Sequence, residues 1–368
     1  MGGFENDMWR EILEKALSRE FSEDRKIAVY GAGDSSLRAI PCFEMMGDDL
    51  VYFIDDTPSK YGTLFFGKRV ISFEEAHELC KSFIVLVCSL SKKTEDTLFN
   101  LLYTNPIEGV VIGTPEEYVF CREKNKVLAV YDMLADEKSK ETYANMILYR
   151  MGKIKLSRAL IDTGKQYFSL PEIYTWPLAE VFVDCGGFVG DTLEQAIMAN
   201  EGPFEKTFVF EPDRNNFQAL QYRVERLTRE WNIDDNSICL INAGVGEKDQ
   251  EVQIIKDVKQ GGISTRLSAR EEGKDAIQVF SLDNYFSEQK ISFLKADIEG
   301  FEYPMLMGAQ HVIKRDQPVI TICIYHSACD MYRVPLKLKE ICPEYQFAVR
   351  QYRLGKLETV LYAWVSNG

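Results

Sequence analysis

Hydrophobic and polar positions alternate along the chain in two series of short apolar runs, each run being followed by a helix-patterned segment. In the first series, residues 26–33 form an apolar run that ends in glycines, and a helical stretch leads to a second run at 50–55. Further runs at 83–88 and 109–112 continue this alternation. Strands that alternate with helices are typical of a parallel sheet, so we expect an N-terminal α/β domain over residues 1–125.

The second series begins near residue 180 and predicts a larger α/β domain over residues 179–368. Its strand-like runs lie at 180–184, 207–211, 237–242, 293–297 and 319–325. Two final runs, 345–352 and 358–365, are too close for a crossover helix and must form an antiparallel hairpin. We therefore expect a seven-stranded, mostly parallel sheet with a C-terminal antiparallel hairpin. Residues 251–255 and 277–281 predict a further hairpin, inserted between the third and fourth strands.

Residues 126–178 separate the two series and contain a helix-patterned segment at 136–151, so we expect a helical connector. A length of 368 residues also favours two domains, because single cores stop growing at roughly 250 to 300 residues. The fold class is thus α/β, with two Rossmann-like domains. The oligomeric state is left open.

Charge and hydropathy exclude some classes of partner. A net charge of -14 disfavours binding to a phosphate backbone, so nucleic acid is not expected as a partner. The first residues carry acidic side chains without an apolar segment, and no run of 18 apolar residues occurs, so we expect a cytoplasmic protein without membrane insertion. Nine cysteines without CxxC or Cys/His zinc spacing indicate reduced thiols.

The strongest chemical signal is the segment VFVDCGGFVGDT, residues 181–192. An apolar strand ends in Asp184, glycines allow a tight turn, and a helix begins near Asp191. Such a turn receives an adenosine-bearing ligand. Because the GK[ST] ending of a phosphate loop is missing and Asp184 is acidic, the pattern favours a cofactor with an ammonium and a sulfonium group over a pyrophosphate.

Acidic residues follow two further strands of the same series. Glu211 ends the second strand, where a carboxylate can accept both hydroxyls of a ribose. Asp297 and Glu299 stand where the fourth strand leaves the sheet, and ligands of open α/β sheets bind at this edge. His326 ends the fifth strand and is the best-placed general base among three histidines, with an ordinary pKa near working pH.

In this order, the segments VDCGGFVGDT, FEPD, NAGVGEKD, SLDNYF and KADIEGFE resemble the FkbM-type methyltransferases. The flanking segments YDMLADEKSKETYANMILYR and CIYHSACDMYRVPLKLKEICPEYQFAVRQY resemble a bacterial branch with an added N-terminal domain. The resemblance implies a class I methyltransferase fold, S-adenosylmethionine (SAM) as donor and S-adenosylhomocysteine (SAH) as product. It also implies O-methyl transfer to a sugar, glycan or similar small hydroxyl acceptor. Gly187 departs from the family, whose members usually carry alanine there, and we expect a slightly looser turn.

The residues expected to bind the cofactor share a position at a strand end or at the start of the next helix. They are Asp184, Cys185, Gly186, Gly187, Gly190, Asp191, Thr192, Glu211, Pro212, Asp213, Asn242, Ala243, Gly244 and Asp297. The catalytic candidates are His326, Asp297 and Glu299. These three side chains suit a divalent ion as well, although their spacing is not diagnostic and no metal is assigned.

The N-terminal domain allows three interpretations. Gly31 and Gly33 satisfy only part of a dinucleotide fingerprint, while Asp55 and Asp56 end the second strand as a ribose-binding acid would. A degenerate scaffold, a domain that binds a nucleotide sugar or an acceptor carrier, and an NAD-binding domain all remain open. A nucleotide-sugar oxidoreductase or epimerase is the main alternative function, but residues 1–125 contain no YxxxK pair. A non-catalytic SAM-binding module is the other.

Overall fold

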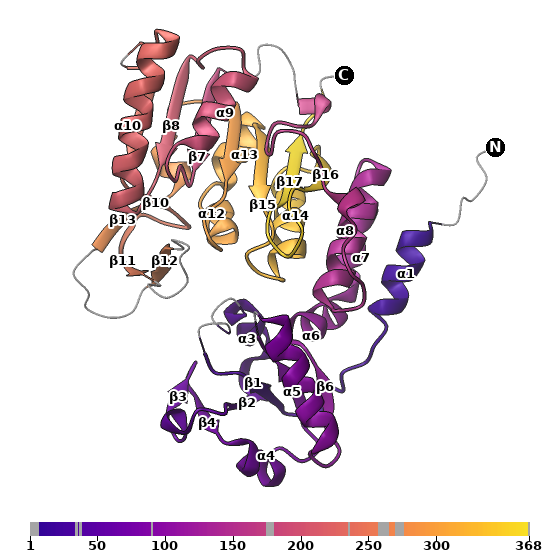
Figure 1. The fold of residues 1–368 in the computed structure, drawn as a ribbon. Coiled ribbons are helices and arrows are strands. Elements are labelled where there is room, and N and C mark those ends of the chain that lie inside the picture. Colours follow the sequence, from indigo (N-terminus) through magenta and orange to yellow (C-terminus); the bar gives the residue numbers. More distant parts are fainter. Residues whose placement is uncertain are drawn as a thin grey trace, which may run out of the picture. The chain divides into compact units, whose positions relative to one another are not determined.

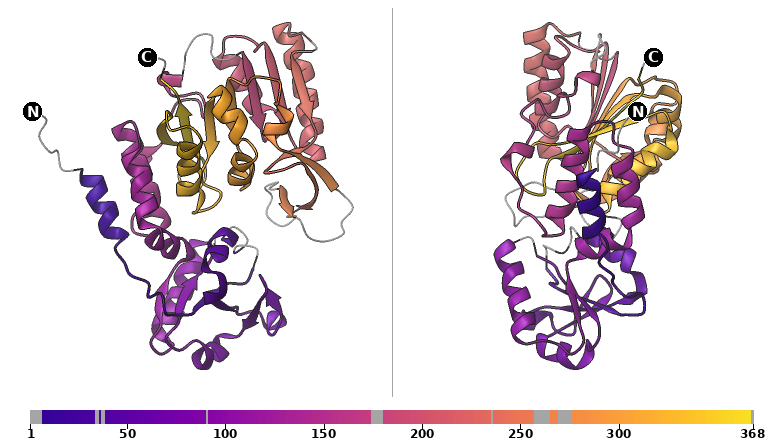
Figure 2. Two further views of the ribbon diagram at one scale, coloured as in Figure 1. Left: turned by 180° about the vertical axis from the view of Figure 1, so that it is seen from behind. Right: turned by 90° about the vertical axis from the view of Figure 1, so that its right-hand side faces the viewer.

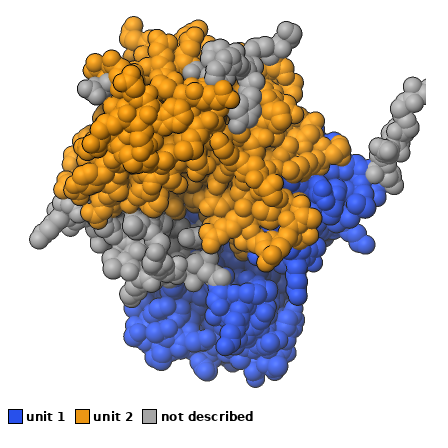
Figure 3. Space-filling view, turned by 45° about the horizontal axis from the view of Figure 1, so that its top comes forward, with its two compact units in different colours: residues 1–132, 140–156, 327–332 blue, residues 133–139, 157–326, 333–368 orange. Residues whose placement is uncertain are grey.

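The computed structural model describes residues 7–33, 36, 39–89, 91–173, 180–234, 236–256, 265–268 and 276–366. The chain divides into two compact units, and each combines segments that are distant in sequence (Figure 3). Unit 1 consists of Met1–Asp132, Lys140–Leu156 and Ser327–Tyr332, and unit 2 of Met133–Ser139, Ser157–His326 and Arg333–Gly368. The domain boundaries near residues 125 and 178 stay a prediction.

Unit 1 is built on a six-stranded sheet with the order β3-β4-β2-β1-β5-β6 (Figure 1). Its strands are β1 Ile27–Tyr30, β2 Leu50–Ile54, β3 Leu64–Phe65, β4 Lys68–Ile71, β5 Ile84–Val87 and β6 Val111–Gly113. All neighbours pair in parallel except β3 and β4. The strands expected at 26–33, 50–55, 83–88 and 109–112 are confirmed, because each apolar run contains one strand.

The helices described in residues 7–132 of unit 1 are α1 Met8–Ala16, α3 Ile40–Met46, α4 Phe73–Leu79, α5 Lys92–Thr104, α6 Pro115–Arg122 and α7 Lys124–Asp132. Side chains cap the starts of α1, α4, α5 and α6. At the start of α4 the Ser72 side chain accepts from the Glu75 amide, and the Glu75 side chain accepts from the Ser72 amide. These bonds satisfy amides that a helix start leaves without partners.

The segment expected to connect the domains is helical only in its first half. Helix α8 spans Glu137–Arg150, close to the predicted 136–151. Beyond it, among described residues, only the 3-10 turns Arg158–Leu160 and Pro171–Ile173 follow. The turn at Gly152, with φ of +74°, ends the regular helix because the left-handed region favours glycine.

Unit 2 contains the seven-stranded sheet, with the order β16-β17-β15-β14-β7-β8-β9. Its strands are β7 Val181–Cys185, β8 Lys206–Phe210, β9 Ile238–Ile241, β14 Phe293–Ala296, β15 Val319–Cys323, β16 Gln346–Gln351 and β17 Thr359–Trp364. Neighbours from β9 to β15 pair in parallel, whereas β17 is antiparallel to both β15 and β16. The predicted parallel sheet with a C-terminal antiparallel hairpin is confirmed.

Helices cover both faces of this sheet (Figure 2). They are α9 Asp191–Ala199, α10 Arg214–Trp231, α11 Leu282–Tyr285, α12 Glu302–Met307, α13 Gln310–Asp316 and α14 Asp330–Ile341. Leu193 of α9 and Leu220 of α10 share one core cluster with Phe182 of β7 and Phe293 of β14. Because strand order reverses direction after β9, right-handed connections place the later helices on the opposite face. The carboxyl ends of β7 and β14 lie side by side at this reversal.

A smaller four-stranded sheet, ordered β10-β13-β11-β12, follows β9. Its strands are β10 Gly244–Val245, β11 Gln250–Lys256, β12 Thr265–Ser268 and β13 Ala276–Phe280. The expected pairing of residues 251–255 with 277–281 is confirmed, because β11 runs antiparallel to β13. Strand β12 adds an edge that the sequence pattern did not predict.

Candidate functional site

The glycine turn after β7 is closely packed against neighbouring segments, which leave no space for a side chain at Gly186 or Gly187. Gly186 has φ of +90°, and a Cβ there would lie 2.0 Å from the Asp297 carbonyl oxygen. A Cβ on Gly187 would lie 2.2 Å from Val209 Cγ1. The amides of both glycines donate to the Phe210 carbonyl, each over 2.9 Å. The turn therefore touches the segment after β14 on one side and β8 on the other.

An ion pair lies beneath this turn. Lys295 Nζ is 2.9 Å from Asp184 Oδ1 and donates to the Gly186 carbonyl over 2.8 Å. The Asp184 side chain has no exposed surface, and that of Lys295 has 2%. Burial raises the pKa of Asp184 although Lys295 opposes the shift. Burial alone would lower the pKa of Lys295, but the Asp184 and Asp297 carboxylates raise it above its ordinary value.

Glu211 follows β8 and is held by backbone amides. Its Oε2 accepts from the Phe188 amide and its Oε1 from the Asp213 amide, each over 2.8 Å. Burial raises the pKa of Glu211 to about 7, although these amides favour the ionised form. Asn242, after β9, donates from Nδ2 to the Glu211 carbonyl over 2.8 Å. Hydrogen bonds of Glu211 and Asn242 thus link the ends of β8 and β9 beside the glycine turn.

Two tyrosine hydroxyls orient the Asp297 carboxylate. Tyr167 donates to Oδ2 over 2.8 Å, and Tyr325 donates to Oδ1 over 3.2 Å. Burial alone would raise the pKa of Asp297, but His326, Lys295 and Tyr167 together lower it. The carboxylate is therefore ionised and fixed in direction.

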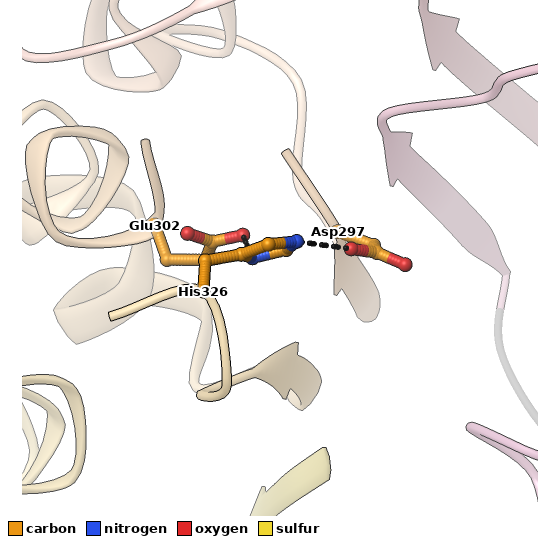
Figure 4. Close-up of side chains that lie close together, drawn as sticks. All are labelled: Asp297, Glu302 and His326. Atoms are coloured by element: carbon orange, nitrogen blue, oxygen red, sulfur yellow. Dashed lines mark ion pairs between the residues drawn. The ribbon is translucent and has the colours of Figure 1, made fainter. Parts of the chain in front are cut away.

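His326 lies among three carboxylates, and Figure 4 shows two of them, Asp297 and Glu302. Its Nδ1 is 2.9 Å from Glu302 Oε1, and its Nε2 is 3.4 Å from Asp297 Oδ1 and 3.7 Å from Glu299 Oε2. Burial alone would lower the pKa of His326, but the Glu302, Asp297 and Glu299 charges raise it to about 10. These charges favour the protonated imidazole, which disfavours His326 as the base that takes a proton from an acceptor. The catalytic assignment of His326 stays a prediction.

Comparison with known proteins supports the resemblance seen in the sequence. Residues 184–347 match the family model of the methyltransferase FkbM domain. The match runs from Asp184 in β7 to Phe347 in β16. This chain carries a methyltransferase FkbM domain. It is accordingly a SAM-dependent methyltransferase, and the resemblance of the sequence to FkbM-type methyltransferases is confirmed.

One solved structure of an FkbM methyltransferase is similar to this chain in fold, and others are less similar. The crystal structure of methyltransferase FkbM from Methylobacillus flagellatus KT is 20% identical, covers 98% of this chain and 94% of that chain, and has a TM-score of 0.55. Spermidine synthase from Thermotoga maritima is 12% identical, covers 57% of this chain and 58% of that chain, and has a TM-score of 0.32. No curated protein matches the sequence significantly.

The residues expected to bind the cofactor of the FkbM domain gather at the carboxyl ends of β7, β8, β9 and β14, but differ in exposure. Those with accessible surface are Gly186, Asp191, Pro212, Asn242 and Asp297. Those that are buried are Asp184, Cys185, Gly187, Gly190, Thr192, Glu211, Asp213, Ala243 and Gly244. The second group lies within the turn and at the strand ends, and its member Asp213 caps α10 by accepting from the Asn215 and Asn216 amides.

Three side chains of the FkbM site were missed by sequence reasoning. Lys295 stands in the apolar run FLKA, where a buried lysine needs an acidic partner, and this signal was available. Glu302 lies three residues after Glu299 on α12 and resembled an ordinary helix-start acid. Tyr167 reaches Asp297 from 130 residues away, and no local pattern indicates such a contact.

In unit 1, the acid after β2 has partners from its own chain. Asp55 accepts from the Ala32 amide, the Thr57 amide and Lys60 Nζ, each over 2.9 Å. Tyr30 donates to the Asp56 carboxylate over 2.6 Å. Residues 34, 35, 37 and 38, which belong to the expected glycine turn, lie outside the described residues. The three interpretations of this unit stay predictions.

Proposed function

We propose that the FkbM domain methylates a hydroxyl group of a sugar, a glycan or a similar small acceptor. The observation that carries this proposal is the contact between Gly186 and Asp297, since it joins the glycine turn to the acidic segment that holds the catalytic candidates. A donor held at the turn then lies next to groups that can act on an acceptor. Methyl transfer requires this proximity, because it is an in-line displacement.

The residues at the turn have the chemistry that SAM requires. Glu211 keeps lone pairs for ribose hydroxyls beyond the two amide bonds that fix its direction. Asn242 fastens the neighbouring strand end. Asp184 has no exposed surface and reaches the turn through Lys295, which donates to the Gly186 carbonyl. When bound, SAM supplies an electrophilic methyl group.

We assign the catalytic role toward the acceptor to the carboxylates of Asp297 and Glu299. Their side chains are 24% and 41% exposed, whereas that of His326 is 7% exposed. His326 holds the two carboxylates together, and the two tyrosine hydroxyls fix the direction of Asp297. A hydroxyl acceptor must lose its proton during transfer, and carboxylates that accept hydrogen bonds suit a polyhydroxylated molecule.

The first test is calorimetric titration of the full chain with SAH, using wild type, Glu211→Ala and Glu225→Ala. Glu225 lies exposed on α10 and serves as the matched control. Binding by wild type and the control, with loss in Glu211→Ala, supports the cofactor site. Absence of binding by folded wild type would contradict it.

The acceptor class is tested by transfer of a labelled methyl group from SAM to free sugars, nucleotide-linked sugars, glycans and amines. Label on hydroxyl acceptors supports the proposal, and label on amines alone would overturn it. SAH binding without transfer to any acceptor favours a non-catalytic module, and turnover of a nucleotide sugar without SAM favours an oxidoreductase or epimerase.

The expectations on membrane insertion, cellular location and acceptor carrier are the last to consider. Among the helices of the described residues, none is both long and apolar enough to cross a membrane. A cytoplasmic location and a nucleotide-linked acceptor stay predictions.

A further inference from the structure

The geometry points to a divalent cation site formed by Asp297, Glu299 and His326, with Glu302 holding the imidazole from behind. One oxygen each from Asp297 and Glu302 and one His326 nitrogen lie within 4.8 Å of one another. Figure 4 shows the imidazole between the Glu302 and Asp297 carboxylates. All four residues belong to unit 2.

Glu302 fixes which ring nitrogen is available. Its side chain has no exposed surface, and its Oε1 lies 2.9 Å from His326 Nδ1 while also accepting from the Ile298 amide over 2.9 Å. Metal-binding histidines almost always present one nitrogen to a carboxylate or carbonyl, which sets the tautomer and directs the other nitrogen at the ion. Here the directed nitrogen is Nε2, so an ion bound to it lies across the ring from Glu302.

The directed nitrogen lacks a hydrogen bond although it is buried. Among described residues, neither nitrogen of the His326 ring makes a hydrogen bond of standard geometry, but Nδ1 faces Glu302 Oε1 at 2.9 Å, whereas no atom lies as close to Nε2 in its ion pairs, and the side chain is 7% exposed. It lies 3.4 Å from Asp297 Oδ1 and 3.7 Å from Glu299 Oε2, both beyond the usual N–H···O range. Two ligands about 2.1 Å from one ion lie roughly 3 to 3.5 Å apart. The first distance fits ligands that share an ion, and the second needs only a small movement of Glu299.

The charge of the cluster also favours a cation. Three carboxylates surround a single imidazole, and the nearby Lys295 is already paired with Asp184. A divalent ion leaves this group of side chains closer to neutral than the imidazole alone does. Buried or half-buried charge without compensation is costly, so the ion stabilises the arrangement.

The ligand set indicates which cation fits. One imidazole nitrogen with two carboxylate oxygens suits Mn²⁺, Fe²⁺, Co²⁺ or Zn²⁺ better than Ca²⁺, which takes oxygen ligands. The inference that an ion binds here does not depend on the proposed function, whereas a catalytic role for the ion rests on it. A divalent ion bound to the neutral imidazole beside the acceptor would lower the pKa of a coordinated hydroxyl.

The experiment titrates chelator-treated full-length protein with Mn²⁺ alone, by calorimetry and by the loss of the free-ion electron paramagnetic resonance signal. The variants are Glu299→Gln, His326→Asn and Glu302→Gln, with His311→Ala as control because His311 is exposed on α13. We expect one Mn²⁺ per chain in wild type and control. Glu299→Gln and His326→Asn should weaken binding at least tenfold, and Glu302→Gln by about 10- to 100-fold.

The outcomes separate the ion from the methyl transfer. No Mn²⁺ binding by folded wild type overturns the site, as does equal binding by wild type, Glu299→Gln and His326→Asn. Glu299 is partly exposed, so this variant keeps the test valid if His326→Asn fails to fold. SAH binding without Mn²⁺ binding rejects the ion and leaves the proposed function intact. Mn²⁺ binding without SAH binding supports the ion and rejects the function.

Discussion

The Lys295 ammonium lies 2.9 Å from the Asp184 carboxylate, and both side chains are buried beneath the glycine turn. Removing one partner leaves the other charge buried without compensation. We therefore expect Lys295→Met to lower the free energy of unfolding by about 3 to 5 kcal/mol. Urea denaturation followed by tryptophan fluorescence measures this change.

The double variant Asp184→Leu/Lys295→Met is the control for this pair, because it replaces both charges by apolar groups. It should recover most of the lost stability, since replacing a whole buried pair is often neutral. A single variant as stable as wild type would show that the pair contributes nothing.

Gly186→Ala should abolish SAH binding. The substitution combines a positive φ of +90° with a Cβ 2.0 Å from the Asp297 carbonyl oxygen, so the turn and the acidic segment must separate. Gly355→Ala is the matched control, because Gly355 has φ of +116° and nothing within 4 Å of its Cβ position. It should cost only about 1 to 2 kcal/mol and keep full SAH affinity. Calorimetric titration of both variants decides, and equal affinities would contradict the contact.

Gly187→Ala tests a position where sequence and structure differ. The departure from the family's alanine predicted a slightly looser turn, but the added Cβ would lie 2.2 Å from Val209 Cγ1. Overpacking of this kind costs about 1 to 3 kcal/mol, so the variant should be less stable than wild type in thermal unfolding. Gly187→Ala/Val209→Ala should restore part of the loss, and the absence of any rescue would refute the steric cause.

The pKa of Glu211, raised to about 7, predicts opposite effects of pH on stability and on cofactor binding. Because the folded protein favours the protonated carboxyl, its contribution to stability is complete below the ordinary pKa of 4.5 and is lost as pH rises through about 7. Ribose hydroxyls need the ionised carboxylate as acceptor. SAH affinity should therefore rise between pH 6 and pH 8, by up to about tenfold.

Glu211→Gln provides the control for this pH dependence. It keeps the side-chain shape but does not titrate, so its SAH affinity should be weak and independent of pH. Calorimetry at several pH values compares the two proteins, and a flat profile in wild type would exclude ionisation of Glu211 as the cause.

The sequence by itself determined the elements of the fold. The runs at 181–185 and 293–296, apolar except for Asp184 and Lys295, became the central strands β7 and β14, because a strand buried on both faces is mostly apolar. The short interval between residues 352 and 358 forced an antiparallel pair, since no crossover fits there. The resemblance to the family followed from the order of the glycines and acidic residues at the ends of these strands, which can be read directly from the sequence.

Tertiary structure alone decided what the polar residues do. Asp184 ends its strand as expected, but Lys295 of the neighbouring strand pairs with it and removes it from the surface. His326, after β15, loses its ordinary pKa because Asp297, Glu299 and Glu302, all from the segment after β14, surround it. Charge interactions depend on distances between chain segments far apart in sequence, and a linear pattern does not contain those distances.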